Sequence, residues 1–139
     1  MHVEAYLNFD GRAQEAIDFY KSAVGAKVEM VMRFKDAPPE VQGSMSPESK
    51  DKVMHASFKI GDTTILASDG YCTGKASFAG VSLALSAESP AEAEKLFKVL
   101  SDGGQVTMPM TEAFFANRFG ICTDKFGVAW MVIHPKSMG

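Results

Sequence analysis

The sequence predicts an α+β fold made of two tandem βαβββ modules, whose curved mixed sheets surround a cavity. The first observation behind this prediction is an internal repeat, because "EAIDFYKSAVGAKVEM" (15–30) overlays "EAEKLFKVLSDGGQVTM" (92–108) with one residue inserted. A second match overlays "KIGDTTIL" (59–66) on "KFGVAWMV" (125–132). In addition, strand patterns and helix patterns follow one another in the same order in both halves. Duplication explains these observations together better than chance does.

The first module begins with a run of strand formers at 3–9, and a helix follows it. Apolar residues recur at helical spacing across 11–25, where Gly25 is suited to end the helix. The strands that alternating patterns then predict are 26–34, 53–60 and 63–68. Because helices cover one face of such a sheet, its other face is available for a ligand.

The second module repeats this order. A strand is predicted at 80–86, and a helix extends from Pro90 to Ser101. Ser89 is suited to the N-cap position and Pro90 to the first helical position. The strands predicted after this helix are 105–110, 118–124 and 128–133.

A chain of 139 residues fits the usual size of one domain, so we predict a single domain over 1–139. Within it, module one spans 1–68, a linker spans 69–79 and module two spans 80–134. The segment 35–52 has three prolines, three serines and mixed charge, and predicts a long mobile loop rather than a helix or strand. This loop is either an insertion without a role or a lid over a ligand site.

The composition excludes several classes of protein. Hydrophobic residues make up 46% of the chain and charged residues 22%, and a net charge of −3 argues against a nucleic-acid surface. Cys72 and Cys122 lack C-x-x-C or zinc spacing, which favours a reduced intracellular compartment. The chain shows no leader pattern and no apolar stretch long enough to cross a bilayer. We expect a soluble cytoplasmic protein that binds neither nucleic acid nor membrane.

The duplicated order, "FDGRAQEAIDFYKSAVGAKV" (9–28) and "TDKFGVAWMVI" (123–133) resemble the vicinal oxygen chelate superfamily over nearly the whole chain. This superfamily includes glyoxalase I, extradiol dioxygenases, fosfomycin-resistance enzymes and bleomycin-resistance binding proteins. The segments "MHASFKIGDTTILASD" (54–69), "GKASFAGVSLAL" (74–85) and "EAFFANRFGICTDKFGVAWM" (112–131) are similar to its PhnB-like subgroup. Some members of that subgroup are labelled 3-demethylubiquinone 3-methyltransferases.

The resemblance implies where metal ligands would lie, namely on the first and last strands of both modules. In this chain the first-strand positions fall on Ala5 and Ser82, and the last-strand positions on Met131 and on Ile65 or Leu66. A hard or borderline divalent ion needs carboxylate, imidazole or thiolate ligands, which these side chains lack. We therefore expect no metal and no other cofactor.

Strand alternation indicates which side chains face the cavity. Met131 is expected there as a soft apolar group, whereas Trp130 on the alternate face is expected to be a packing residue. In the strand 53–60, His55 and Ser57 point away from the apolar side. His55 is either a structural histidine or a ligand-binding or general-base residue. Asp69 either orients His55 or, as we favour, shapes a turn.

The candidate site residues come from the first strands, the third strands, an aromatic lining and the last strand. The candidates for ligand binding are Ala5, Phe9, Ser57, Ser82, Phe115, Phe119, Ile121 and Met131, with Phe114 as a further lining residue. The lining candidates Phe9, Phe114, Phe115, Phe119 and Ile121 are equally suited to the core. The candidate catalytic residue is His55. A methyltransferase that uses S-adenosylmethionine is not supported, because "FDGRAQ" offers a single glycine and the predicted fold is wrong for that cofactor.

Three functions follow as hypotheses. The first is a metal-free small-molecule-binding protein that holds an apolar or aromatic ligand in the concave sheet, as bleomycin-resistance proteins hold their drug. The alternative is a lyase, isomerase or dioxygenase-like enzyme that uses His55 or a non-standard metal site. The third is a structural or regulatory dimer with a vestigial cavity. The resemblance also implies a homodimer.

Overall fold

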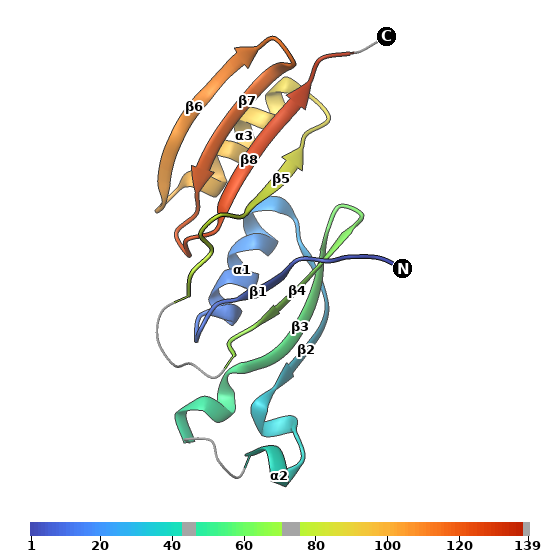
Figure 1. Ribbon diagram of the computed structural model, residues 1–139, viewed down its shortest axis with the longest axis vertical. Helices are drawn as coiled ribbons and strands as arrows, with labels where there is room; N and C mark the ends of the chain where they lie inside the picture. The colour runs from blue at the N-terminus through green and yellow to red at the C-terminus, as the bar shows by residue number, and fades with distance from the viewer. Residues whose placement is uncertain (43–46, 71–75, 138–139) are drawn as a thin grey trace. The chain divides into compact units, whose positions relative to one another are not determined.

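The computed structural model describes residues 1–42, 47–70 and 76–137, and it divides into two compact units, Met1–Ser77 and Phe78–Gly139. Figure 1 shows that each unit contains one sheet and one longer helix packed on it. We call the sheet of Met1–Ser77 the first sheet and the sheet of Phe78–Gly139 the second sheet. In the described ranges, no helix has the length and apolar character needed to span a membrane.

The elements follow the predicted order in both units. The first unit contains β1 (Tyr6–Asn8), α1 (Ala13–Val24), β2 (Lys27–Arg33), the short helices η1 (Phe34–Asp36), α2 (Pro39–Gln42) and η2 (Pro47–Asp51), β3 (Val53–Ile60) and β4 (Thr63–Ser68). The second unit contains β5 (Ser82–Ser86), α3 (Pro90–Ser101), β6 (Gln105–Ala113), β7 (Ala116–Thr123) and β8 (Ala129–Pro135).

The two sheets have the same topology, which confirms the tandem βαβββ prediction. Their strand orders are β1-β4-β3-β2 and β5-β8-β7-β6. The first strand of each sheet pairs in parallel with the last strand, and the other pairs are antiparallel. The helices α1 and α3 both have 12 residues, and the overlay of Glu15 on Glu92 aligns their ends.

The hairpin overlay predicted from sequence is wrong by one residue. Leu66 and Met131 occupy equivalent places in the two last strands. Their rows of cross-strand partners are Tyr6–Leu66–Ser57 in the first sheet and Ala84–Met131–Ile121 in the second. Pairing Lys59 with Lys125 instead carries Leu66 onto Val132. The reason is the length of the two connections. The chain from Ile121 to its partner Met131 is one residue longer than the chain from Ser57 to its partner Leu66.

The prediction of a loop without helices at 35–52 is also wrong, because the segment contains parts of η1, α2 and η2. Its first turn is closed by the Arg33 backbone N–H, which donates to Asp36 Oδ2 at 3.0 Å. The Arg33 guanidinium donates to the carbonyl of Asp51 at 2.9 Å, and the Phe34 N–H donates to the carbonyl of Lys52 at 3.1 Å. These bonds join the two ends of the segment. Its role as a lid remains a prediction.

The core of the first unit lies between α1 and one face of the sheet. Ile17 and Tyr20 on α1 and Phe58 on β3 are fully buried, and the rings of Tyr20 and Phe58 stack with their centroids 6.0 Å apart. Burying each such side chain contributes about 1.5 to 3 kcal/mol. Gly25 ends α1 in the left-handed conformation at φ 69°, as the sequence predicts.

The second unit has an equivalent core under α3. Leu100 of α3, Cys122 of β7 and Trp130 and Val132 of β8 are buried. The packing role predicted for Trp130 is therefore confirmed. Gly120 allows the helix to approach the sheet, because a Cβ at this position would lie 2.9 Å from Phe97 Cε2.

Candidate functional site

Each sheet has one face under its 12-residue helix and one opposite face, which we call the open face. The helix α1 packs on β2 and β3, and α3 packs on β6, β7 and β8. Because side chains alternate along a strand, the neighbours of the buried residues point to the open face. On β3 these neighbours are His55 and Ser57, and on β8 they are Met131 and Ile133. The alternation predicted for both strands is therefore present.

The open face of the second sheet is mainly apolar. Its two central rows, taken across the strands, contain Ala84, Met131, Ile121 and Met108, and then Ser86, Ile133, Phe119 and Thr111. The Phe115 ring extends this surface, since it meets the Phe119 ring edge-on with centroids 5.2 Å apart. The open face thus brings together five predicted ligand-binding residues, which are Ser82, Phe115, Phe119, Ile121 and Met131.

The open face of the first sheet is more polar. Its hydroxyl, imidazole, amide and carboxylate groups belong to Tyr6, Asn8, Glu29, His55 and Ser57, with Met30, Met32 and Leu66 among them. The Tyr6 hydroxyl lies 3.1 Å from His55 Nδ1, and Ser57 Oγ donates to Glu29 Oε1 at 3.2 Å. The predicted residues His55 and Ser57 therefore lie on one face, on the same strand.

Two predicted ligand-binding residues lie away from these open faces. Phe9 is only 3% exposed and its ring is 6.3 Å from the Tyr20 ring, so it belongs to the core. Ala5 precedes Tyr6, and alternation places it on the side of buried Leu7. Sequence reasoning therefore missed Tyr6.

The error of one residue at Ala5 has a local cause. Alignment backward from the helix gives Ala5 as the first-strand position, and it crosses a turn in which Asp10 and Gly11 have φ values of 50° and 112°. This turn changes the length of the connection between strand and helix. The signal that could have identified Tyr6 is the apolar alternation of Leu7 and Phe9 within the first strand, which leaves Tyr6 on the other side.

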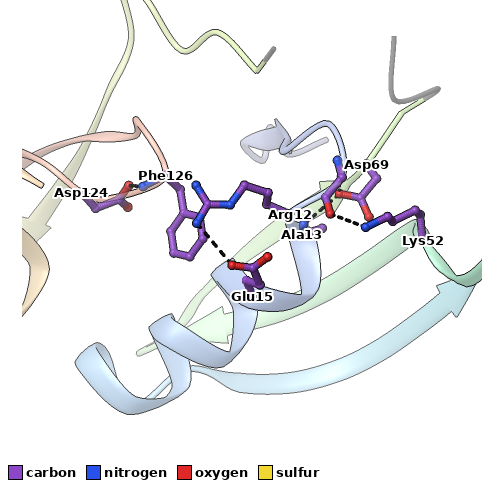
Figure 2. A network of polar contacts seen from close by, with 8 residues as sticks. Arg12, Ala13, Glu15, Lys52, Asp69, Asp124 and Phe126 are labelled. Atoms are coloured by element: carbon purple, nitrogen blue, oxygen red, sulfur yellow. Dashed lines mark hydrogen bonds and ion pairs between the residues drawn. The ribbon is translucent and has the colours of Figure 1, made fainter. Parts of the chain in front are cut away.

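Asp69 has a structural role that the sequence did not reveal. It is buried, and its Oδ1 accepts hydrogen bonds from the N–H groups of Gly11 and Ala13, each at 2.8 Å. Its Oδ2 accepts from the Val53 N–H at 2.8 Å. Figure 2 shows Asp69 beside the start of α1, where Arg12 gives no side-chain cap. Asp69 thus caps α1 from another part of the chain and tethers the start of β3.

Asp124 organises the conspicuous "TDKFGVAWM" segment. Its Oδ1 accepts hydrogen bonds from the backbone N–H of Phe126 at 2.9 Å and of Val128 at 3.1 Å. Its Oδ2 accepts from Trp130 Nε1 at 2.9 Å. Figure 2 shows the bond between Asp124 and Phe126. The segment is thus a folded loop that fixes the start of β8, which carries Met131.

The thiol of Cys122 is unreactive near neutral pH. Its pKa is raised from 9.0 to about 11, first by burial and then by the negative charge of Asp124. Because the thiolate is the nucleophilic form, this residue is a poor nucleophile near neutral pH. Cys72 lies outside the described residues.

The strand positions at which the superfamily resemblance implies metal ligands do not fit a metal centre. In the structure, Leu66 and Met131 lie beside Tyr6 and Ala84 on the first strands, rather than beside the predicted Ala5 and Ser82. The side chains observed at these places offer one phenol and one thioether, whereas divalent ions of this kind prefer carboxylate, imidazole or thiolate. Within the described ranges, no group of three or more His, Cys, Asp or Glu residues could hold a metal ion.

Two units of the same strand order, each with an open sheet face, define a glyoxalase-like fold. A glyoxylase/bleomycin resistance protein/dioxygenase domain from Frankia sp. EAN1pec matches this fold with a TM-score of 0.61 at 18% identity, over 97% of this chain and 95% of that chain. At this identity the match shows the fold alone.

The chain belongs to the PhnB-like family, whose model is described as 3-demethylubiquinone-9 3-methyltransferase and matches residues 2–133. The chain is 33% identical over 140 residues to Protein YjdN of Escherichia coli K12. The alignment covers 95% of this chain and 94% of that protein. The crystal structure of protein PA1353 from Pseudomonas aeruginosa is 37% identical, with a TM-score of 0.85 and 99% of both chains covered.

The methyltransferase description implies S-adenosylmethionine, which the residues before α1 do not fit. A methyl donor of that type is usually held by a glycine-rich turn that follows the first strand of an α/β sheet. Here the N–H groups of Gly11 and Ala13 in the corresponding turn already donate to Asp69. The turn is therefore built to receive a side chain of the protein itself.

Proposed function

We propose that this chain is a metal-free small-molecule-binding protein that holds an apolar or aromatic ligand on the open face of the second sheet. The observation that carries the proposal is the continuous row of Met108, Ile121 and Met131 beside Phe119, on the face opposite α3. Soluble proteins rarely leave such a patch without a binding role. Thioether side chains also adapt their shape to different apolar ligands.

We expect a small ring compound to bind this surface with modest affinity. A ligand that covers about 150 Å² of apolar surface gains roughly 4 kcal/mol from burial, before ordering costs are subtracted. Ser82 and Thr123 lie in the next row of the same face and offer hydroxyl groups at its margin.

Titration with an apolar fluorescent dye, Nile red, tests this proposal. We expect saturable binding by the wild-type chain and about tenfold weaker binding by Met131→Gln, because an amide on the apolar face must be desolvated. Met30→Gln is the matched control, since Met30 lies on the open face of the first sheet. Non-saturable binding, or equal losses in the two variants, would contradict the proposal.

The metal-free part is tested by metal analysis of the purified protein. We expect zinc, nickel, iron and manganese well below one equivalent. A stoichiometric metal that is lost in His55→Ala would instead favour the second candidate, a lyase, isomerase or dioxygenase-like enzyme. The observation that favours such an enzyme is the contact between Tyr6 Oη and His55 Nδ1 on an open face, because imidazole is well suited to proton transfer.

We further propose that the chain forms a homodimer in the cytoplasm. Phe114, between β6 and β7, is 91% exposed and packs edge-on against Phe115 with ring centroids 5.1 Å apart. Burial of this pair in a subunit interface would remove apolar surface from water. Light scattering should give twice the chain mass, and Phe114→Ser should weaken the dimer; a wild-type monomer would refute this part. The free thiol of Cys122 suits a reducing compartment.

A further inference from the structure

The polar contact on the first sheet places an exposed aromatic ring beside an imidazole. Tyr6 is 53% exposed although it lies in a strand, and its ring centroid is 5.6 Å from that of His55. The side chains come from β1 and β3, with β4 between them. The two rings thus meet over the open face of the sheet, away from the core under α1.

The hydrogen bond in this pair determines what His55 offers to a ligand. Tyr6 Oη lies 3.1 Å from His55 Nδ1, and in the tautomer that carries its proton on Nε2 the phenol donates to Nδ1. In this tautomer Nε2 is a donor. Among the described residues, Nε2 has no hydrogen-bond partner. His55 therefore presents one oriented N–H to a ligand oxygen.

The neighbours of this donor favour an aromatic ligand without charge. Met32 is the cross-strand partner of His55, and its thioether can contact a ring whose other face meets Tyr6. Glu29 accepts a hydrogen bond from Ser57, two residues from His55 along β3. The negative charge of this carboxylate disfavours an anionic ligand on this face.

We propose that the open face of the first sheet is a second ligand site, which takes an aromatic compound bearing an uncharged carbonyl oxygen. The oxygen accepts the hydrogen bond from His55 Nε2–H, and the ring packs between Tyr6 and Met32. Tyr6 is the positioning residue, because it fixes the imidazole tautomer and orientation. The site shares no residue with the apolar face of the second sheet.

Benzamide, benzoate and benzylamine are suitable probes, since they have similar size and differ in charge. The experiment is an NMR titration of the full chain, with the ring signals of His55 and His134 observed separately. We expect benzamide to shift the His55 signals saturably in the millimolar range, more tightly than either charged probe, and to leave the His134 signals unchanged. Tighter binding of benzoate or benzylamine would overturn the proposal.

Substitutions then test the two residues. Tyr6→Phe keeps the ring but removes the phenol proton, and should weaken benzamide binding about fivefold to tenfold. His55→Gln should abolish the preference for benzamide over benzoate, and His134→Gln should have no effect. Unchanged binding in both Tyr6→Phe and His55→Gln would refute the site. Thermal unfolding of each variant checks that it is folded.

The Met131→Gln variant distinguishes this site from the apolar site of the second sheet. That variant should leave the benzamide titration at His55 unchanged while it weakens binding of Nile red. Loss of the benzamide response in Met131→Gln would place the probe on the other sheet and overturn the inference. Failure of Nile red to bind, with an intact benzamide response, would refute only the proposed function.

Discussion

The two halves of the chain build the same helix by different means. In the second half, Ser89 caps α3 locally, since its Oγ accepts from the Glu92 N–H at 3.0 Å. In the first half, the start of α1 is bound by Asp69, which is 56 residues from Ala13. Both helices nevertheless have 12 residues. Equal geometry can thus rest on a short-range cap in one half and on a long-range tie in the other.

The open faces differ as much as the caps do. The row Tyr6–Leu66–Ser57 is equivalent to Ala84–Met131–Ile121, and by the same register His55 of the first sheet corresponds to Phe119 of the second. Hydrogen-bonding groups in one sheet therefore occupy places that hold aliphatic or aromatic groups in the other. The duplication kept the strand order and the buried faces, whereas the faces available to ligands diverged.

The largest expected effect on stability comes from removing the long-range hydrogen bonds that Asp69 accepts. Asp69→Ala leaves three N–H groups without their acceptor, those of Gly11, Ala13 and Val53. We expect the free energy of unfolding to fall by about 4 kcal/mol, measured by urea denaturation followed by circular dichroism. Asp62→Ala, in the exposed turn between β3 and β4, is the control and should change it by less than about 0.5 kcal/mol. Similar losses in both variants would argue against a capping role for Asp69.

The buried carboxylate of the second half should come next. Asp124→Ala removes the acceptor of Trp130 Nε1 and of two loop N–H groups. We expect a loss of about 3 kcal/mol, smaller than for Asp69 because water can reach this loop at exposed Lys125 and Gly127. Trp130 is the only tryptophan of the chain, so its fluorescence should shift to the red.

Exposed Asp102, also in the second half, supplies the control. Asp102→Ala should leave the emission of Trp130 unchanged. If Asp124→Ala also left the emission and the urea midpoint unchanged, the hydrogen bonds of Asp124 would have no role in holding the loop.

These two aspartates also show what the sequence could and could not predict. The strand order and both helices follow from periodicity, and the Ser89 cap follows from its position before Pro90. The role of Asp69 depends on contacts with Gly11 and Ala13, far away in the chain. A single sequence contains no local signal for such a contact. Asp69 was therefore predicted to be a turn residue.

The candidate site follows the same division. Alternation along the last strand placed Met131 on the open side of the second sheet, and the predicted lining residues Phe119 and Ile121 lie on the same face. In the first sheet, the position of Ala5 required counting across a turn of unusual backbone conformation, and the count was wrong by one. The contact between Tyr6 and His55 crosses an intervening strand and depends on the register of three strands. Register is set by long-range pairing, which pattern alone does not determine.

The third effect is a dependence of stability on pH that arises from Cys122 in the second half. The pKa of Cys122 is about 11 in the fold and 9.0 ordinarily, so the folded state retains the thiol proton longer than the unfolded state. Its contribution is fully present below pH 9 and is lost as the pH rises through 11. We expect a loss of about 2 to 3 kcal/mol over this window.

The measurement compares urea denaturation of the wild type and Cys122→Ala from pH 8 to pH 11, because lysines and tyrosines titrate in both proteins. The difference between the two proteins should shrink as the pH rises. A constant difference would mean that the thiol of Cys122 ionises equally well in the folded and unfolded states.

The smallest effect concerns the local cap and returns to the contrast between the helices. Ser89→Ala removes the acceptor for the Glu92 N–H at an exposed helix end, where water can replace it. We expect a loss of about 1 kcal/mol in the free energy of unfolding, roughly a quarter of the loss for Asp69→Ala. Ser89→Asp should restore most of it, because a carboxylate accepts the same bond and interacts favourably with the helix dipole. If Ser89→Ala proved as damaging as Asp69→Ala, the distinction between a local cap and a long-range tie would have no energetic basis.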